Sequence, residues 1–102
     1  MQQSVFRAVA DPTRREIIAM LSKKPMSTGE VAGRFRMSRP AVAKHLKILS
    51  DGGLISSQKR GRVRINTLNP APLKAVSDWA AQFDKFWDDR LNALKTQVES
   101  DK

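Results

Sequence analysis

The residues best suited to binding chemistry lie in one segment at positions 38–53, which reads SRPAVAKHLKILSDGG. Ser38 is a preferred helix N-cap, and Pro40 falls in the first helical turn, where a missing N–H is tolerated. Gly52 or Gly53 can adopt the left-handed conformation that closes a helix C-terminus. The segment is therefore predicted to form one short helix with both ends marked.

This helix has two chemically different faces. Its apolar residues recur at i, i+4 and i+7, namely Val42, Leu46 and Leu49. At 100° per residue the opposite side carries Pro40, Lys44, Lys47 and Asp51, with Arg39 and Ala41 at the N-terminal end. Such a helix packs along one face and presents a positive face to an anionic partner. We interpret it as a recognition helix for the DNA major groove.

The positive charge is concentrated around this helix. The chain of 102 residues has a formal net charge of +9, and residues 34–64 hold nine basic side chains against Asp51 alone. Residues 1–33 carry a net +2 and residues 65–102 a net −1. A charge confined to the middle third indicates a localised surface for a polyanion, because a charge serving only solubility would be spread along the chain.

Several function classes are disfavoured by the composition. The chain has no cysteine, which removes disulfides, thiolate metal sites and cysteine nucleophiles. No pattern pairs a nucleophile with a base, so we expect no enzyme activity and no cofactor. There is no basic leader followed by an apolar run, and no apolar stretch approaches 18 residues. We therefore expect a cytoplasmic protein without a membrane partner.

Three shorter helices are predicted before the recognition helix. The first spans about 4–10, and the second spans 13–22 after the N-cap Asp11 and Pro12. Ser27 and Glu30 have the spacing of a capping box and begin a third helix that ends near Met37. Only a tight turn then separates the third helix from the recognition helix, which predicts a helix-turn-helix.

A change of period after residue 53 indicates a β-hairpin over about 54–68. The two runs flank Arg60 and Gly61, and in the second run Val63, Ile65 and Thr67 alternate with Arg62, Arg64 and Asn66. An isolated hairpin is marginal in water, so this one is expected to pack on the helices through Leu54, Ile55, Val63 and Ile65. Its basic tip would form the wing of a winged helix.

A long helix is predicted over about 71–98 after the break at Asn69 and Pro70. Its apolar face is wide and aromatic, and a core already supplied by four helices and a hairpin cannot cover all of it. We expect this face to pair with a second copy, as twofold association is the commonest arrangement. The predicted interface consists of Val5, Phe6, Trp79, Phe83, Phe86, Trp87, Leu91 and Leu94.

The predicted fold is a single domain over 1–102, mainly α with a small β-hairpin. Its element order, α-α-α-α-β-β-α, is that of a winged helix-turn-helix that dimerises through its terminal helices.

With these elements in place, several strings resemble the ArsR-type winged-helix transcriptional repressors. They are ADPTRREI at 10–17, SRPAVAKHLKIL at 38–49, GLI at 53–55, LNP at 68–70, and the terminal helix with Trp79, Phe86, Trp87, Arg90 and Leu91. The likeness covers almost the whole chain. It implies homodimers that bind inverted-repeat operators near their own promoters, and many such repressors release DNA when a metal binds.

The sequence departs from this pattern where metal is sensed. Ser27 and Gly29 stand where metal-sensing members carry a Cys-x-Cys pair, and the terminal helix lacks the histidines of their interfacial zinc site. The chain therefore resembles the cysteine-less, metal-independent branch, and no metal site is expected.

The recognition helix supplies most of the candidate DNA contacts. Arg39 is predicted to bind a guanine or, alternatively, a phosphate, and Lys44 to contact DNA. Ser38, Pro40 and Ala41 have roles at the helix start that are compatible with contacts to phosphate or a thymine methyl. Lys47 would meet phosphate or solvent. For the single histidine, His45, a contact with phosphate and a structural hydrogen bond both remain open.

The wing supplies the other candidates. Four basic residues surround its glycine turn and favour contact with phosphate or the minor groove: Lys59, Arg60, Arg62 and Arg64. By contrast, Arg14 and Arg15 are expected to serve the helix surface and intramolecular pairing.

The function predicted from these features is sequence-specific repression of transcription by a homodimer on double-stranded DNA. Two alternatives remain: a winged-helix module that binds a protein partner, and a protein that coats nucleic acid without sequence preference. The inducer is either absent or an unknown small molecule bound between the terminal helices.

Overall fold

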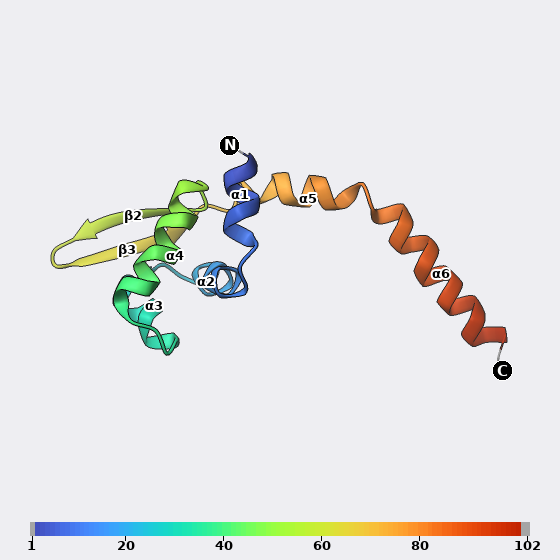
Figure 1. Cartoon of the computed structure of the whole chain (residues 1–102), viewed down its shortest axis with the longest axis horizontal. Coiled ribbons are helices and arrows are strands. Elements are labelled where there is room, and N and C mark those ends of the chain that lie inside the picture. Colours follow the sequence, from blue (N-terminus) through green and yellow to red (C-terminus); the bar gives the residue numbers. More distant parts are fainter. Residues whose placement is uncertain (1, 101–102) are drawn as a thin grey trace.

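The computed structural model describes residues 2–100, and the side chains of residues 4–98. It contains nine elements: α1 (Gln2–Val9), α2 (Pro12–Leu21), β1 (Met26–Ser27), α3 (Thr28–Arg34), α4 (Arg39–Asp51), β2 (Ile55–Arg60), β3 (Val63–Leu68), α5 (Leu73–Ala81) and α6 (Asp84–Ser100). Figure 1 shows the hairpin β2–β3 projecting on one side of the helical body and α6 on the other. The predicted fold class, a mainly helical winged helix-turn-helix, is confirmed.

The helix ends are set by the capping residues that the sequence marks. The carboxylate of Asp11 accepts a hydrogen bond from the Arg14 amide at 3.1 Å, and Ser38 Oγ accepts one from the Ala41 amide at 3.3 Å. Both halves of the capping box at Ser27 and Glu30 are formed. These bonds satisfy backbone donors that the first helical turn leaves free.

The wing is the predicted hairpin, enlarged by a strand that the sequence did not reveal. β2 and β3 pair antiparallel from Ile55↔Leu68 to Arg60↔Val63, and Gly61 begins the turn with φ of 63°. A positive φ at this position is typical of tight hairpin turns and favours glycine. The two-residue strand β1 pairs with the other edge of β3, so the sheet order is β1-β3-β2. This third strand ties the wing to the helix-turn-helix.

The two faces of β3 differ from the sequence-based expectation. The sequence predicts that Val63 packs on the helices, but Val63 is 49 % exposed. It places Asn66 on the polar face, but Asn66 is 1 % exposed. Leu54 and Ile55 are buried as expected. Ile65, also expected to pack on the helices, is half-buried, so the apolar face predicted for β3 is only partly covered. The face that carries Asn66 is stabilised by hydrogen bonds rather than by a row of apolar side chains.

The core lies between α1–α4 and the base of the hairpin. Its residues are Val5, Ala8, Ile17, Leu21, Met26, Val31, Val42, Leu46, Leu49, Leu54 and Ile55. Val5 is 4 % exposed within this core, so its predicted place in a dimer interface is wrong: a side chain already covered by its own chain has no surface left for a partner. Phe6 is half-buried, and its ring meets that of Trp79 edge-on.

The single helix predicted over 71–98 is two helices in the structure. Gln82 Nε2 donates to the Trp79 carbonyl at 2.9 Å, and the Phe83 amide donates to the Ala80 carbonyl, three residues back. In a continuous helix the Trp79 carbonyl would accept from the Phe83 amide, but here it accepts from a side chain. The last turn of α5 is therefore tighter than an α-helical turn. The chain changes direction here, and α6 begins at Asp84 (Figure 1).

The terminal helices extend away from the body. The Cα radius of gyration is 18.3 Å, whereas a compact chain of this length has about 13 Å. Every described side chain from Ser77 to Val98 is exposed, among them the large apolar residues Trp79, Phe83, Phe86, Trp87, Leu91, Leu94 and Val98. Contiguous exposed apolar residues of this kind mark interaction surfaces.

Candidate nucleic-acid interface

Helix α4 is oriented as its sequence pattern predicts. Val42, Leu46 and Leu49 are buried, and this fixes the opposite face outward. The predicted contact residues on that face and at the helix start are exposed, namely Ser38, Arg39, Pro40, Lys44 and Lys47, while Ala41 and His45 are half-buried. The α4 surface that projects from the body is therefore cationic toward its N-terminus.

The N-terminal parts of α3 and α4 and the wing enclose one open groove of about 630 Å³. Three arginines from distant positions line it: Arg39 from α4, and Arg62 and Arg64 from the wing. Arg39 lies over α3, where a Cβ added to Gly29 would be 3.2 Å from its Nη2 atom. The groove thus joins one arginine of α4 to two of the wing on one concave surface, and Glu30 is the acidic residue in its lining.

All four wing cations are exposed. Lys59 and Arg60 lie at the end of β2, and Arg62 is in the turn. Arg64 differs, because its Nη1 atom donates to the Ser57 carbonyl at 3.4 Å and so turns along the sheet. The structure therefore gives the wing a cluster of solvated cations with one arginine at its inner side.

Lys47 is the one α4 cation with an acidic partner among the described residues. Its Nζ lies 3.4 Å from an Asp51 carboxylate oxygen, and both side chains are well exposed. An exposed pair of this kind contributes little to stability, about 0.3–0.5 kcal/mol within a helix. The neighbouring carboxylate weakens the positive potential at Lys47, so this part of α4 is less attractive to an anion than the N-terminal part.

His45 has the structural hydrogen bond that the sequence left open. Its Nδ1 atom lies 3.3 Å from Arg14 Nη1, and a guanidinium can only donate, so Nδ1 accepts. Arg14 also donates to the Ala8 and Arg7 carbonyls, and Arg15 donates to the Val9 carbonyl at 2.8 Å. Both arginines thus bond the free carbonyls at the end of α1, and the predicted intramolecular pairing is confirmed.

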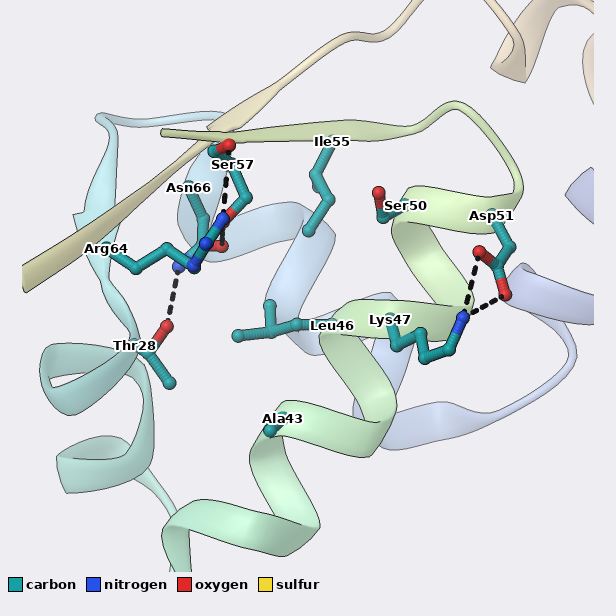
Figure 2. A pocket seen from close by; sticks show the side chains of 10 residues that line it. All are labelled: Thr28, Ala43, Leu46, Lys47, Ser50, Asp51, Ile55, Ser57, Arg64 and Asn66. Atoms are coloured by element: carbon teal, nitrogen blue, oxygen red, sulfur yellow. Dashed lines mark hydrogen bonds and ion pairs between the residues drawn. The ribbon is translucent and has the colours of Figure 1, made fainter. Parts of the chain in front are cut away.

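Asn66 is the residue that sequence reasoning missed. Its Nδ2 atom donates to the Met26 carbonyl at 3.2 Å. The same atom donates to Thr28 Oγ1 at 3.2 Å, and its Oδ1 atom accepts from Ser57 Oγ at 2.8 Å (Figure 2). One side chain thereby joins β1, the start of α3 and both wing strands. An asparagine among alternating residues gives no signal of this role, because its partners lie up to 40 residues away.

Two acidic groups near the interface titrate below their usual range. The Arg14 amide donates to Asp11 and lowers the pKa of its carboxyl. The Ser27 amide, and then the Ser27 side chain, lower the pKa of the Glu30 carboxyl. Each charged form is favoured by the backbone donors of a helix start. A depressed folded-state pKa contributes stability above the unfolded pKa and loses it as the pH falls through the folded value.

Replacing Glu30 by glutamine is therefore expected to flatten the acid side of the stability profile. Glutamine keeps an oxygen that can accept from the Ser27 amide, but it does not titrate. The melting temperature of the wild type, followed by circular dichroism, should fall more steeply than that of the variant between the normal glutamate pKa of about 4.3 and lower pH. Near pH 7 the variant should be the less stable protein, because its neutral amide oxygen accepts more weakly than the carboxylate, and the two proteins should converge at low pH, where Glu30 is protonated. Parallel profiles throughout would contradict the assigned role of the carboxylate.

A helix-turn-helix domain family matches residues 9–58, which cover α2 to most of β2. The transcriptional repressor SdpR of Bacillus subtilis is 34 % identical over 88 residues, 86 % of this chain and 98 % of that protein. The HTH-type transcriptional regulator Rv2034 of Mycobacterium tuberculosis is 34 % identical over 94 % of this chain and 87 % of its own.

The chain is also similar to a transcriptional regulator in its three-dimensional structure. The crystal structure of an ArsR family transcriptional regulator superposes with a TM-score of 0.75 at 38 % identity, covering 84 % of this chain and 89 % of that one. This chain belongs to the ArsR family of transcriptional regulators. The resemblance noted in its sequence is confirmed, and the absence of cysteine agrees with the cysteine-less branch of that family.

As an ArsR-family protein, the chain is a DNA-binding transcriptional regulator. Its family relatives are regulators rather than enzymes. Within residues 2–100, no helix is long and apolar enough to cross a membrane. In the same part of the chain, no three histidine or acidic side chains gather as a metal site would require.

Proposed function

We propose that this ArsR-family regulator is a homodimeric repressor that binds an inverted-repeat operator, including one near its own promoter. The observation that supports the proposal best is the groove in which Arg39 of α4 meets Arg62 and Arg64 of the wing. It offers cations for base edges and for the flanking backbone on one concave surface. SdpR, a relative that matches almost over its full length, is itself a repressor. Repression would follow from occlusion of the polymerase, in the cytoplasm.

The proposed dimer forms through the exposed apolar face of α5 and α6. Trp79, Phe83 and Phe86 pack edge-on with neighbouring rings, yet their outer surfaces face solvent in the single chain. Aromatic residues are enriched at the centre of interfaces that bind tightly. A twofold contact through Trp79, Phe83, Phe86, Trp87, Leu91 and Leu94, with Phe6 at its edge, would bury them.

Each protomer of this dimer would insert α4 into one major groove and direct its wing toward the adjoining minor groove. Twofold symmetry places the two α4 helices on half-sites about one helical turn apart, roughly 34 Å, and so requires an inverted repeat. The proposed contacts are Ser38, Arg39, Pro40, Ala41, Lys44, His45 and Lys47 on α4, and Lys59, Arg60, Arg62 and Arg64 on the wing. Arg39 is assigned to base recognition and the wing cations to phosphate.

The proposal is tested by measuring affinity for the DNA upstream of the protein's own coding sequence and for a scrambled version, at about 150 mM salt. A specific regulator binds its operator roughly 10³-fold or more tighter than other DNA. A ratio near one would indicate the alternative of a nucleic-acid coating protein. Failure to bind either duplex would favour the second alternative, a winged-helix module for a protein partner.

Replacing Arg39 by alanine is expected to relax the sequence preference. Loss of a guanidinium that binds a guanine through two hydrogen bonds costs about 1–3 kcal/mol at that base pair. Titrations on operators carrying each base at each position should therefore show reduced discrimination at one position per half-site. Arg39→Lys is the matched control, because it keeps the charge but not the two-pronged geometry, and it should also lose discrimination. If lysine preserves the preference, Arg39 acts only as a charge.

Replacing Arg62 by alanine is expected to weaken all DNA alike. A side chain that neutralises one phosphate contributes about one counterion, so the slope of log affinity against log salt should fall in magnitude by about one. Lys23→Ala removes the same charge from the end of α2, beside Met20 and Arg34 and outside the groove, and should leave the slope unchanged. A change of sequence preference in Arg62→Ala would reverse the roles assigned to helix and wing.

A further inference from the structure

A second cavity, of about 280 Å³, lies between α4 and the inner face of the wing (Figure 2). It is lined by Thr28, Ala43, Leu46, Lys47, Ser50, Asp51, Ile55, Ser57, Arg64 and Asn66. Leu46 and Ile55 retain small exposed areas of 6 % and 5 % and form an apolar floor with Ala43. The cavity is open, and it adjoins the groove of the nucleic-acid interface, with which it shares Thr28, Ala43 and Arg64.

One end of this cavity is equipped to bind an anion. Figure 2 shows Arg64, Asn66, Ser57 and Thr28 together at that end. Arg64 forms no ion pair with any described acidic residue, and its bond to the Ser57 carbonyl is long at 3.4 Å. Thr28 Oγ1 accepts from Asn66, which leaves its own hydroxyl hydrogen available to a further acceptor. A guanidinium and a hydroxyl donor thus face the same space.

The other end is electrically balanced. Lys47 and Asp51 pair there at 3.4 Å, next to Ser50 at the C-terminal end of α4 (Figure 2). The carboxylate of Asp51 and the negative end of the helix dipole both disfavour an anion at that position. A bound anion would therefore orient its charge toward Arg64 and its apolar part over Leu46 and Ile55.

We propose that this cavity binds a small aromatic monocarboxylate, with the carboxylate on Arg64 and Thr28 and the ring on the apolar floor. Ligand pockets usually measure about 300–1,000 Å³, so a cavity of 280 Å³ suits a single-ring compound. Arg64 is the one cation in the cavity lining without an acidic partner among the described residues, so the cavity favours a ligand with a single negative charge. The ring covers the exposed parts of Leu46 and Ile55, and both contacts are made between α4 and the wing.

A ligand at this position would oppose DNA binding. It neutralises Arg64, occupies space between the recognition helix and the wing, and shares Thr28 and Ala43 with the groove. If ligand and DNA exclude each other, each lowers the apparent affinity of the other by the same factor. The cavity would then act as an inducer site, distinct from the interface of the terminal helices. This regulatory part of the inference rests on the proposed function, whereas the binding itself does not.

The binding is tested on the full-length protein without DNA, with benzoate as the probe and chloride replaced to hold the ionic strength constant. Amide resonances of Ser50, Ile55, Ser57 and Asn66 should shift and saturate in the millimolar range. Benzyl alcohol, which has the same ring without the charge, should bind at least tenfold more weakly. Ser50→Phe should fill the cavity and abolish saturation, whereas Ser56→Phe, on the opposite face of β2, should leave it intact.

The regulatory part is tested by operator titration in the same buffers. At a benzoate concentration nine times its dissociation constant, competition predicts tenfold weaker DNA binding by the wild type and by Ser56→Phe, and no change in Ser50→Phe. Shifts that do not saturate, that benzyl alcohol reproduces equally, or that persist in Ser50→Phe would overturn the site. Saturable benzoate binding in a protein that binds no operator would instead refute the proposed function and leave the site standing.

Discussion

Trp87→Ala is expected to dissociate the proposed dimer while leaving the protomer folded. Trp87 is 59 % exposed in the single chain, so its removal takes little from the core. In the dimer it would lie on the shared aromatic face, where loss of a buried tryptophan costs about 2–4 kcal/mol. That corresponds to a dimer roughly 30- to 1,000-fold weaker, measured by sedimentation velocity across a concentration series. Far-ultraviolet circular dichroism should remain that of the wild type.

The DNA consequence of this change should exceed that of any single contact residue. A protomer alone binds only one half-site. When the protein concentration is below the dimer dissociation constant, which the substitution raises, the affinity for a full operator should therefore fall to the affinity for a half-site. Asn92→Ala is the matched control, because at 100° per residue Asn92 lies about 140° around α6 from Trp87. A Trp87→Ala protein that sediments as a dimer would remove the aromatic face from the interface.

Asn66→Leu is expected to be the most destabilising change in the wing. Leucine has a similar volume but leaves the Met26 carbonyl and the hydroxyls of Thr28 and Ser57 without their partner. The Met26 carbonyl is the buried partner, and leaving it unsatisfied costs about 1–3 kcal/mol. The hydroxyls of Ser57 and Thr28 are only part-buried and can turn toward water, so a total loss of about 2–4 kcal/mol is expected. For a chain of this length the melting temperature should fall by roughly 10–25 °C, measured by differential scanning calorimetry.

The wing should lose its position before the helices unfold in this variant. Amides of β2 and β3 should exchange with solvent faster than those of α2 and α4, and the magnitude of the salt slope of DNA binding should decrease. Thr67→Val, one position along and on the exposed face, should change the free energy of unfolding by no more than about 0.5 kcal/mol. An Asn66→Leu protein as stable as the wild type would show that these hydrogen bonds do not hold the wing.

The helix-turn-helix was predictable because its determinants are local. Ser27 with Glu30, and Ser38 with Ala41, satisfy each other within one helical turn, so spacing alone identifies the helix starts. The stripe of Val42, Leu46 and Leu49 is likewise complete within α4 and determines which face is buried. These two patterns predict the candidate DNA contacts on α4, because the face opposite the buried stripe must point toward solvent.

The break between α5 and α6 shows where local patterning becomes ambiguous. The apolar spacing continues through the break, so it predicts one helix over 71–98. In the structure the Trp79 carbonyl accepts from the Gln82 side chain, and the Phe83 amide bonds the Ala80 carbonyl instead. The spacing of apolar residues carries no information about that choice.

By itself the sequence determined the order of elements, the helix starts, the outward face of α4, the concentration of charge and the family resemblance. These depend on residues that interact within a few positions or on simple composition. Only the tertiary structure decided that Val5 belongs to the core, that Asn66 and not Val63 faces inward, and that Arg39, Arg62 and Arg64 share one groove. Each of these depends on pairing between segments far apart in the chain. An alternating strand can turn either of its two faces toward the core, and in β3 the pairing of Met26 with Asn66 determines which face it is.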